Sequence, residues 1–237
     1  MGLTPYCLML EEFSRSHRMF ALLAGAGGGL TPIAIARQGS DAQRDKYLKG
    51  LMAGTLRTAF ALTEPAGGSD NSAMKTRADK VDGGWAINGR KHYITSAHAA
   101  DFIMVMAVTD QEKRTRGGVT AFLVDKGTPG FEITRVDTTM GSPVVKLSEL
   151  TFENCRVPDS AVVGKVGGGF DLAKSSITDG RMGIATSCIG VADRLLEMAI
   201  AHAKQRVTFG KPLSERQAIQ WMLVDCAVEL NSTRAFV

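Results

Sequence analysis

The feature that most constrains the fold is a change in the spacing of apolar residues along the chain. Residues 3 to about 55 have helical spacing, residues 56 to 160 break into short apolar runs of strand length, and residues from about 168 onward return to helical spacing. No run with helical spacing separates the strand-like segments. The pattern predicts an α+β fold, in which an antiparallel β-sandwich or barrel lies between two helical parts.

The expected strands are bounded by turn-forming residues. The residues at 82–84 and 127–130 indicate turns, and Asn88-Gly89 is the strongest short hairpin signal in the chain. We expect strands at 75–81, 85–87, 102–108, 118–124, 131–135 and 146–152. The predicted domains are therefore the end of a helical domain (1–57), a β-domain (58–160) and the start of a helical bundle (161–237).

Three local patterns add detail to the helical parts. Ser40 before residues 41–48 predicts an N-cap with a charged first turn, and Gly54 predicts the end of that helix. Ser214, three residues before Gln217, has the spacing of a capping box. One apolar helix face is predicted by the spacing of Ile184, Cys188, Val191, Leu195 and Met198.

Composition excludes several classes of function. The 237 residues are 44% apolar and 22% charged, as in ordinary globular proteins. The net charge of +4 is spread without a strongly basic block, which argues against a nucleic-acid surface. The four cysteines and four histidines lack metal-ligand spacing, so no metal site is expected and the thiols are expected to be reduced. The uncharged run 19–36 is rich in glycine and predicts a buried helical region, not a membrane span.

The stretch best suited to binding a ligand is Phe60-Ala61-Leu62-Thr63-Glu64-Pro65-Ala66-Gly67-Gly68-Ser69-Asp70. A strand there runs into a tight turn that presents backbone N–H groups beside small hydroxyls. Such a turn suits ring nitrogens, carbonyl groups or phosphates. From composition alone, an ordinary Asx turn without a ligand is the simpler interpretation.

This stretch closely resembles the flavin-binding signature of the acyl-CoA dehydrogenase family. Four further segments match the family in order and spacing: residues 88–95 (NGRKHYIT), 164–170 (GKVGGGF), 179–181 (DGR), and 206–211 (RVTFGK) followed by Gln217. The similarity covers about residues 10 to 237. Five motifs in order argue strongly against chance similarity.

The resemblance implies FAD as the cofactor and an acyl-CoA thioester as the substrate. Thr63 and the backbone near Gly68 would bond the edge of the flavin ring, and Tyr93 with Thr95 would cover its other side. The implied cofactor-binding residues are Phe60, Leu62, Thr63, Gly68, Ser69, Tyr93, Ile94, Thr95, Arg206, Thr208, Phe209 and Gln217. The implied substrate-binding residues are Ser69, Thr178 and Arg181.

Four positions depart from the family pattern. Ala66-Gly67 replaces the more usual Gly-Ala order, and Tyr93 replaces the common Trp. Thr178 stands where the family often has Asp, which puts its substrate contact in doubt.

The residues from 206 onward would meet the pyrophosphate and adenosine of FAD in a neighbouring subunit. This agrees with the cluster of Lys204, Arg206 and Lys211 before a helix N-terminus, which suits an anion, although a solvated basic loop would look the same. The resemblance thus implies a homo-oligomer, a dimer or tetramer, with electron-transfer flavoprotein as the electron acceptor. It implies no nucleic-acid partner. We expect the protein in the cytoplasm of a bacterium or in the mitochondrial matrix of a eukaryote, not secreted.

The implied reaction is α,β-dehydrogenation, which needs a carboxylate to remove the α proton and flavin N5 to accept a hydride. In most of the family this Glu lies on a helix beyond what corresponds to Val237. In a minority of the family, this Glu occupies the position immediately before the one matched by Arg181. That position is Gly180 here, and neither Glu64 nor Asp179 is a credible substitute. We therefore expect an internal piece of the protein that is inactive alone. Two alternatives stay open: a flavin- and CoA-binding or assembly module without redox turnover, and an acyl-CoA oxidase.

Overall fold

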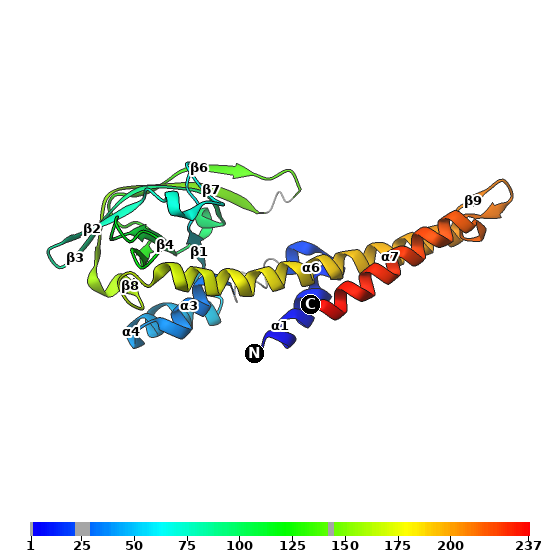
Figure 1. The fold of residues 1–237 in the computed structure, drawn as a ribbon, viewed down its shortest axis with the longest axis horizontal. Coiled ribbons are helices and arrows are strands. Elements are labelled where there is room, and N and C mark those ends of the chain that lie inside the picture. The colour runs from blue at the N-terminus through cyan, green and yellow to red at the C-terminus, as the bar shows by residue number, and fades with distance from the viewer. Residues whose placement is uncertain (1, 22–28, 142–144) are drawn as a thin grey trace. The chain divides into compact units, whose positions relative to one another are not determined.

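The computed structural model describes residues 2–21, 29–141 and 145–237, without the side chain of Asp179. The chain divides into two compact units, Met1–Gly25 with Thr178–Val237 and Ala26–Ile177 (Figure 1). The domain bounds given above stay predictions, and residues 22–28 of the glycine-rich run lie outside the described residues. Among the helices that are described, none is long and apolar enough to cross a membrane.

The unit of residues 26–177 is built on an eight-stranded sheet with strand order β6-β7-β3-β2-β4-β5-β8 and β1 beside β4. Its pairs are antiparallel, as predicted, except that β1 and β2 each run parallel to β4. The fold class is confirmed. The strands are β1 (Thr58–Ala61), β2 (Arg77–Val81), β3 (Gly84–Thr95), β4 (Phe102–Val108), β5 (Val119–Asp125), β6 (Phe131–Thr138), β7 (Lys146–Pro158) and β8 (Val162–Val163).

Two apolar clusters lie on opposite faces of β4, whose seven residues are all buried. On one face, Val105 joins a cluster in which the rings of Trp85 and Phe122 lie 5.6 Å apart, so β3 packs against β5 there. On the other face, Met104 joins residues from α3 (Leu30–Gln38), α5 (Lys49–Met52) and the start of α6 (Gly169–Gln205). Burial on both faces explains why this run of apolar residues has no alternation.

The predicted N-cap at Ser40 is confirmed. Ser40 Oγ accepts a hydrogen bond from Gln43 N (3.2 Å), and Ser40 N donates to Gln43 Oε1 (3.1 Å), which closes a capping box. The helical run continues through α4 (Asp41–Gln43), the π-helical segment η1 (Arg44–Leu48) and α5. It ends before Gly54, whose φ of 71° is the left-handed conformation expected at a helix end.

The predicted hairpin turn at Asn88-Gly89 is wrong, because both residues lie inside β3, where the register with β7 shifts between Ile87 and Gly89. Gly89 has a φ of 146°, and a Cβ there would lie 2.6 Å from the Thr76 backbone. Asn88 Oδ1 accepts a hydrogen bond from Asn154 N (2.8 Å). The Asn-Gly pair therefore serves a bulge, and the true turn is at Gly83, where φ is 71°.

The other unit contains α1 (Leu3–Ser16), residues 178–205 of α6, and α7 (Gln217–Phe236). Figure 1 shows α6 and α7 side by side, joined through the hairpin of β9 (Val207–Thr208) and β10 (Lys211–Pro212). Short 3-10 turns complete the chain: η2 (Asn71–Ala73), η3 (Ala97–Ala99), η4 (Asp159–Ala161) and η5 (Leu213–Glu215).

The apolar face predicted on α6 is largely exposed, at Ile184, Leu195 and Met198 among others, whereas Gly190 and Ile189 are buried. The reason is close packing on small residues, since a Cβ at Gly190 would collide with the backbone of Glu11 in α1. The capping box predicted at Ser214 is absent: α7 begins after Arg216 without a side-chain cap, because Ser214 lies in η5.

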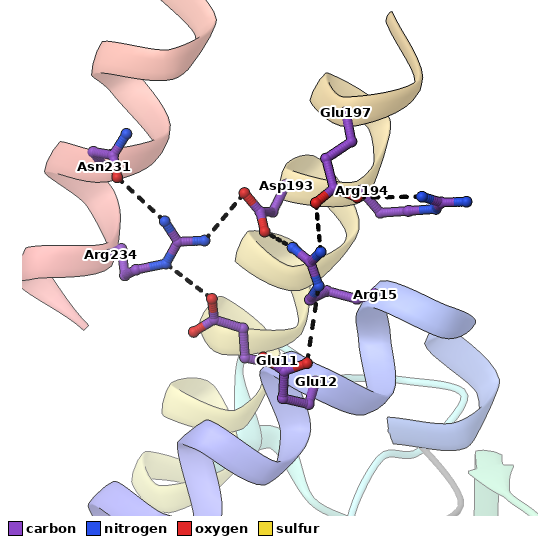
Figure 2. Close-up of polar contacts among 8 residues, drawn as sticks. All are labelled: Glu11, Glu12, Arg15, Asp193, Arg194, Glu197, Asn231 and Arg234. Atoms are coloured by element: carbon purple, nitrogen blue, oxygen red, sulfur yellow. Dashed lines mark hydrogen bonds and ion pairs between the residues drawn. The ribbon is translucent and has the colours of Figure 1, made fainter. Parts of the chain in front are cut away.

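A network of charges joins α1, α6 and α7 (Figure 2). Arg15 forms ion pairs with Asp193 and with Glu197 (2.6 Å). Arg234 forms ion pairs with Glu11 (2.9 Å) and Asp193 (3.4 Å), so Asp193 is shared by both arginines. A shared, partly buried network of this kind holds the three helices in register better than isolated surface pairs would.

Candidate functional site

The stretch predicted to bind a ligand begins within β1, which lies beside β4 with Ala61 opposite Val105. The chain then turns between Glu64 and Gly67, which exchange two backbone hydrogen bonds (3.0 and 3.1 Å). A Cβ at Gly67 would lie 2.8 Å from the Asp70 carbonyl, so the turn needs glycine at that position. Beyond it, Gly68 and Ser69 are exposed, and Thr63 is half-buried.

A buried ion pair lies under this turn. Lys91 of β3 is fully buried, and its Nζ donates hydrogen bonds to Glu64 Oε1 (2.8 Å) and to the Leu62 carbonyl (3.0 Å). The Glu64 carboxylate also accepts from the backbone N–H groups of Lys75 (2.7 Å) and Thr76 (3.0 Å). The pair therefore ties together the end of β1, the middle of β3 and the segment before β2.

The environment shifts the pKa of both partners. Burial lowers the pKa of Lys91 to about 8, although the carboxylate of Glu64 opposes this shift. Burial alone would raise the pKa of Glu64, but the Lys91 charge and the hydrogen bonds outweigh it and hold the pKa below its usual value. Both groups are charged at neutral pH, so the pair is an ion pair.

Tyr93 projects from a β-bulge next to this pair. Lys91 pairs with Leu150 and Ile94 pairs with Ser148, so His92 and Tyr93 on β3 stand opposite one residue of β7. The Tyr93 backbone has a φ of 56°, a strained conformation for a bulky residue, and 59% of the side chain is exposed. Bulges often re-aim side chains next to functional sites, which makes Tyr93 a candidate contact for a ligand.

The turn and the bulge are joined directly, because His92 N donates a hydrogen bond to the Thr63 carbonyl (2.9 Å). The result is a surface with the exposed ring of Tyr93 on β3 beside the turn after β1, which carries Thr63 and the exposed Gly68. A flat heteroaromatic group with polar edges fits this chemistry: the ring offers stacking, and the turn offers hydroxyl and backbone donors.

The structure brings together the predicted residues of the turn and of β3. Leu62 and Ile94 are buried in the two core clusters, so their side chains do not face a ligand. Phe60 is half-buried against the core, and Thr95 is exposed.

The second predicted group lies in the other unit, on the β9–β10 hairpin. Arg206 is exposed and, among the residues that are described, has no side-chain hydrogen bond or ion pair. Phe209 at the tip is 98% exposed with a φ of 50°, and Gln217 is exposed at the start of α7. Thr208 is already engaged, since its carbonyl (2.6 Å) and Oγ1 (3.1 Å) accept hydrogen bonds from Arg216.

The predicted substrate contacts Thr178 and Arg181 are exposed residues of α6 in this same unit. Their relation to Ser69 of the other unit stays a prediction.

Two residues that matter for the geometry were missed from the sequence. Arg216 supports the hairpin, because its guanidinium also lies 5.7 Å from the centre of the Phe209 ring. Lys91 carries no pattern that marks it as buried; the available signal was a lysine in the same strand as the aromatic residue of the motif.

Comparisons with known proteins identify the class of protein to which this chain belongs. Residues 59–155 match the profile "Acyl-CoA dehydrogenase, middle domain", residues 167–237 match the C-terminal domain, and residues 1–55 match the N-terminal domain. The chain belongs to the acyl-CoA dehydrogenase family.

Individual relatives support this family assignment. The chain is 37% identical over 98% of its length to "Acyl-CoA dehydrogenase, short-chain specific" of Megasphaera elsdenii. It is similar to the structure of butyryl-CoA dehydrogenase from that organism (36% identity, 98% of this chain, TM-score 0.93). It is also similar to the FAD complex of PigA (32% identity, 99% of this chain, TM-score 0.93). The chain spans about three fifths of each of these proteins: 61%, 61% and 62%.

Proposed function

We propose that this chain forms the flavin-binding part of an FAD-dependent acyl-CoA dehydrogenase. The observation that carries the proposal is the strained, exposed Tyr93 in a bulge that is hydrogen-bonded to Thr63. When bound, FAD would supply the acceptor for the hydride that leaves the β carbon of the thioester. The similarity to the FAD complex of PigA supports FAD as the cofactor for this fold.

The chain's own residues would bind and orient the reactants. The Thr63 hydroxyl and the backbone near Gly68 would bond the polar edge of the flavin, Tyr93 and Thr95 would cover its face, and Ser69 would meet the thioester. The buried pair of Lys91 and Glu64 would hold the turn in place without touching either reactant.

Glu64 is a poor candidate for the base that removes the α proton. Its oxygens already accept hydrogen bonds from Lys91, Lys75 and Thr76, and its lowered pKa makes it a weak base. We propose that the catalytic carboxylate comes from sequence outside residues 1–237 and that this chain alone is inactive.

Two basic regions suit the phosphate groups of the ligands. Arg206 would bind the FAD pyrophosphate of a neighbouring subunit, which supports a homo-oligomer. In the unit of residues 26–177, Lys75, Arg77 and Arg114 line one surface pocket, whose charge suits the phosphates of a CoA thioester. Electron-transfer flavoprotein is the proposed electron acceptor.

An anaerobic titration of the whole, FAD-loaded protein with acyl-CoA thioesters of different chain length tests the proposal. We expect loss of flavin absorbance with at least one thioester and reoxidation by electron-transfer flavoprotein. Bound flavin that no thioester reduces would favour a flavin- and CoA-binding module without redox turnover. Rapid reoxidation of the flavin by O₂ would favour an acyl-CoA oxidase. Protein that never binds FAD would contradict the proposal.

A further inference from the structure

The β-bulge that carries Tyr93 has a second member, His92, and both residues lie opposite Glu149 of β7. The rings of His92 and Tyr93 are in contact, with centroids 3.8 Å apart and planes at 73°. The backbone N–H of His92 donates to the Thr63 carbonyl (2.9 Å). His92 therefore contacts both halves of the proposed flavin surface while exposing little of its own side chain.

The imidazole has an unsatisfied nitrogen. Nδ1 of His92 is buried and has no hydrogen-bond partner among the described residues, although Oε2 of Glu149 lies 3.6 Å away. That distance is too long for a hydrogen bond but short enough for attraction between opposite charges. A small rotation of the ring would close the contact.

The charges around His92 come from β7, from β6 beyond it, and from the buried pair of Lys91 beside it and Glu64 in the turn. Glu149 also lies 3.7 Å from Nη1 of Arg135 on β6, and Arg135 forms an ion pair with Asp137 (3.0 Å). Glu149 thus stands between a permanent cation and a histidine whose charge can change. Protonation of His92 would add a second cation beside this carboxylate and would place a charged ring against Tyr93.

We propose that His92 is a positioning residue for the flavin: its protonation holds the ring of Tyr93 in place through Glu149, so that FAD affinity depends on pH. The inference rests on the proposed function, in which Tyr93 covers the flavin. Histidine is the side chain whose charge changes most readily near neutral pH, so a pH dependence of FAD binding is the expected signature. Because linkage is reciprocal, FAD binding would also favour proton uptake by His92.

The test is the dissociation constant of FAD for the whole apoprotein, measured by fluorescence between about pH 5.5 and 7, below the pKa of about 8 of the neighbouring Lys91. The wild type should bind FAD about two- to fivefold more tightly at the acid end, the range expected for a partly exposed ion pair. His92→Phe keeps a ring against Tyr93 but cannot titrate, so its pH dependence should be lost. Glu149→Gln should reduce the dependence in the same way.

His98→Phe is the matched control, because Nδ1 of His98 also lacks a hydrogen-bond partner among the described residues. It should keep the wild-type profile. A His92→Phe protein with the wild-type pH dependence, or a wild type without any dependence, would overturn the inference. If His92→Phe does not fold, Glu149→Gln decides the question. A wild type that binds no FAD at any pH would instead contradict the proposed function.

Discussion

The buried lysine at position 91 is a costly residue in an apolar sheet, and its partners explain why it is tolerated. Its ammonium group bonds Glu64 and the Leu62 carbonyl, and Glu64 is in turn held by two backbone N–H groups. A buried charge is stable only when it is paired and hydrogen-bonded in this way. The pair therefore stabilises the geometry of the turn more than it stabilises the fold as a whole.

Lys91→Met should lower the free energy of unfolding by about 3–5 kcal/mol, because it leaves the Glu64 carboxylate buried without a counter-charge. Urea denaturation followed by circular dichroism would measure the change. The double variant Lys91→Met/Glu64→Gln removes both charges and should recover much of the loss. A single variant that is as stable as the double variant would show that the pair is not tightly coupled.

The sequence alone could not reveal this pair, since its members are 27 residues apart and each is an ordinary charged residue. Thr63 lies in the turn that the sequence pattern already marked as suited to a ligand, whereas Tyr93 was singled out through the family resemblance. The exposure and backbone strain of Tyr93, which make it a plausible ligand contact, depend on the bulge and are visible only in the structure.

Among the strands, β3 shows how one signal can serve two structures. Asn-Gly is typical of a hairpin turn, but a glycine with positive φ is equally suited to a bulge. The run at 102–108 was predicted with its observed bounds, because an uninterrupted apolar run has few alternatives. The buried face of α6 was not predicted, because its packing against α1 uses glycines that carry no apolar signal.

Gly89→Ala should destabilise the unit of residues 26–177 by roughly 1–3 kcal/mol, the range for a strained backbone site. The added Cβ would meet Thr76 at 2.6 Å in addition to the cost of its φ. Gly83→Ala is the matched control, because Gly83 has positive φ but no atom within 4 Å of the Cβ position. Thermal melting should show a larger loss of melting temperature for Gly89→Ala than for Gly83→Ala. Equal losses would contradict the claim that the bulge needs glycine at position 89.

The β9–β10 hairpin allows a test of the second predicted group. Arg206→Ala should weaken FAD binding to the whole protein by roughly tenfold to a hundredfold, since charge-assisted hydrogen bonds contribute about 1.5–3 kcal/mol each. Lys204→Ala, which matches no family motif, should have little effect. FAD titration of both apoproteins measures the dissociation constants. An unchanged dissociation constant for Arg206→Ala would show that Arg206 does not bind the pyrophosphate.

For the molecule as a whole, apolar residues on α6 and α7 remain exposed within their unit, among them Leu195, Met198, Trp221, Met222 and Val228. Apolar surface of this kind favours association. We expect the whole protein to be a dimer or tetramer, and the 237-residue chain alone to self-associate. Sedimentation equilibrium would test this, and a monomeric whole protein with tightly bound FAD would contradict it.

The most direct test of the account is the FAD affinity of Tyr93→Ala. The side chain is 59% exposed, so its loss should leave the melting temperature nearly unchanged, as should that of Val136→Ala, an exposed control on β6. Stacking of a base on an aromatic side chain is worth roughly 1–3 kcal/mol, so FAD should bind at least about fivefold more weakly. Equal dissociation constants for wild type, Tyr93→Ala and Val136→Ala would show that the turn and bulge are not the flavin site.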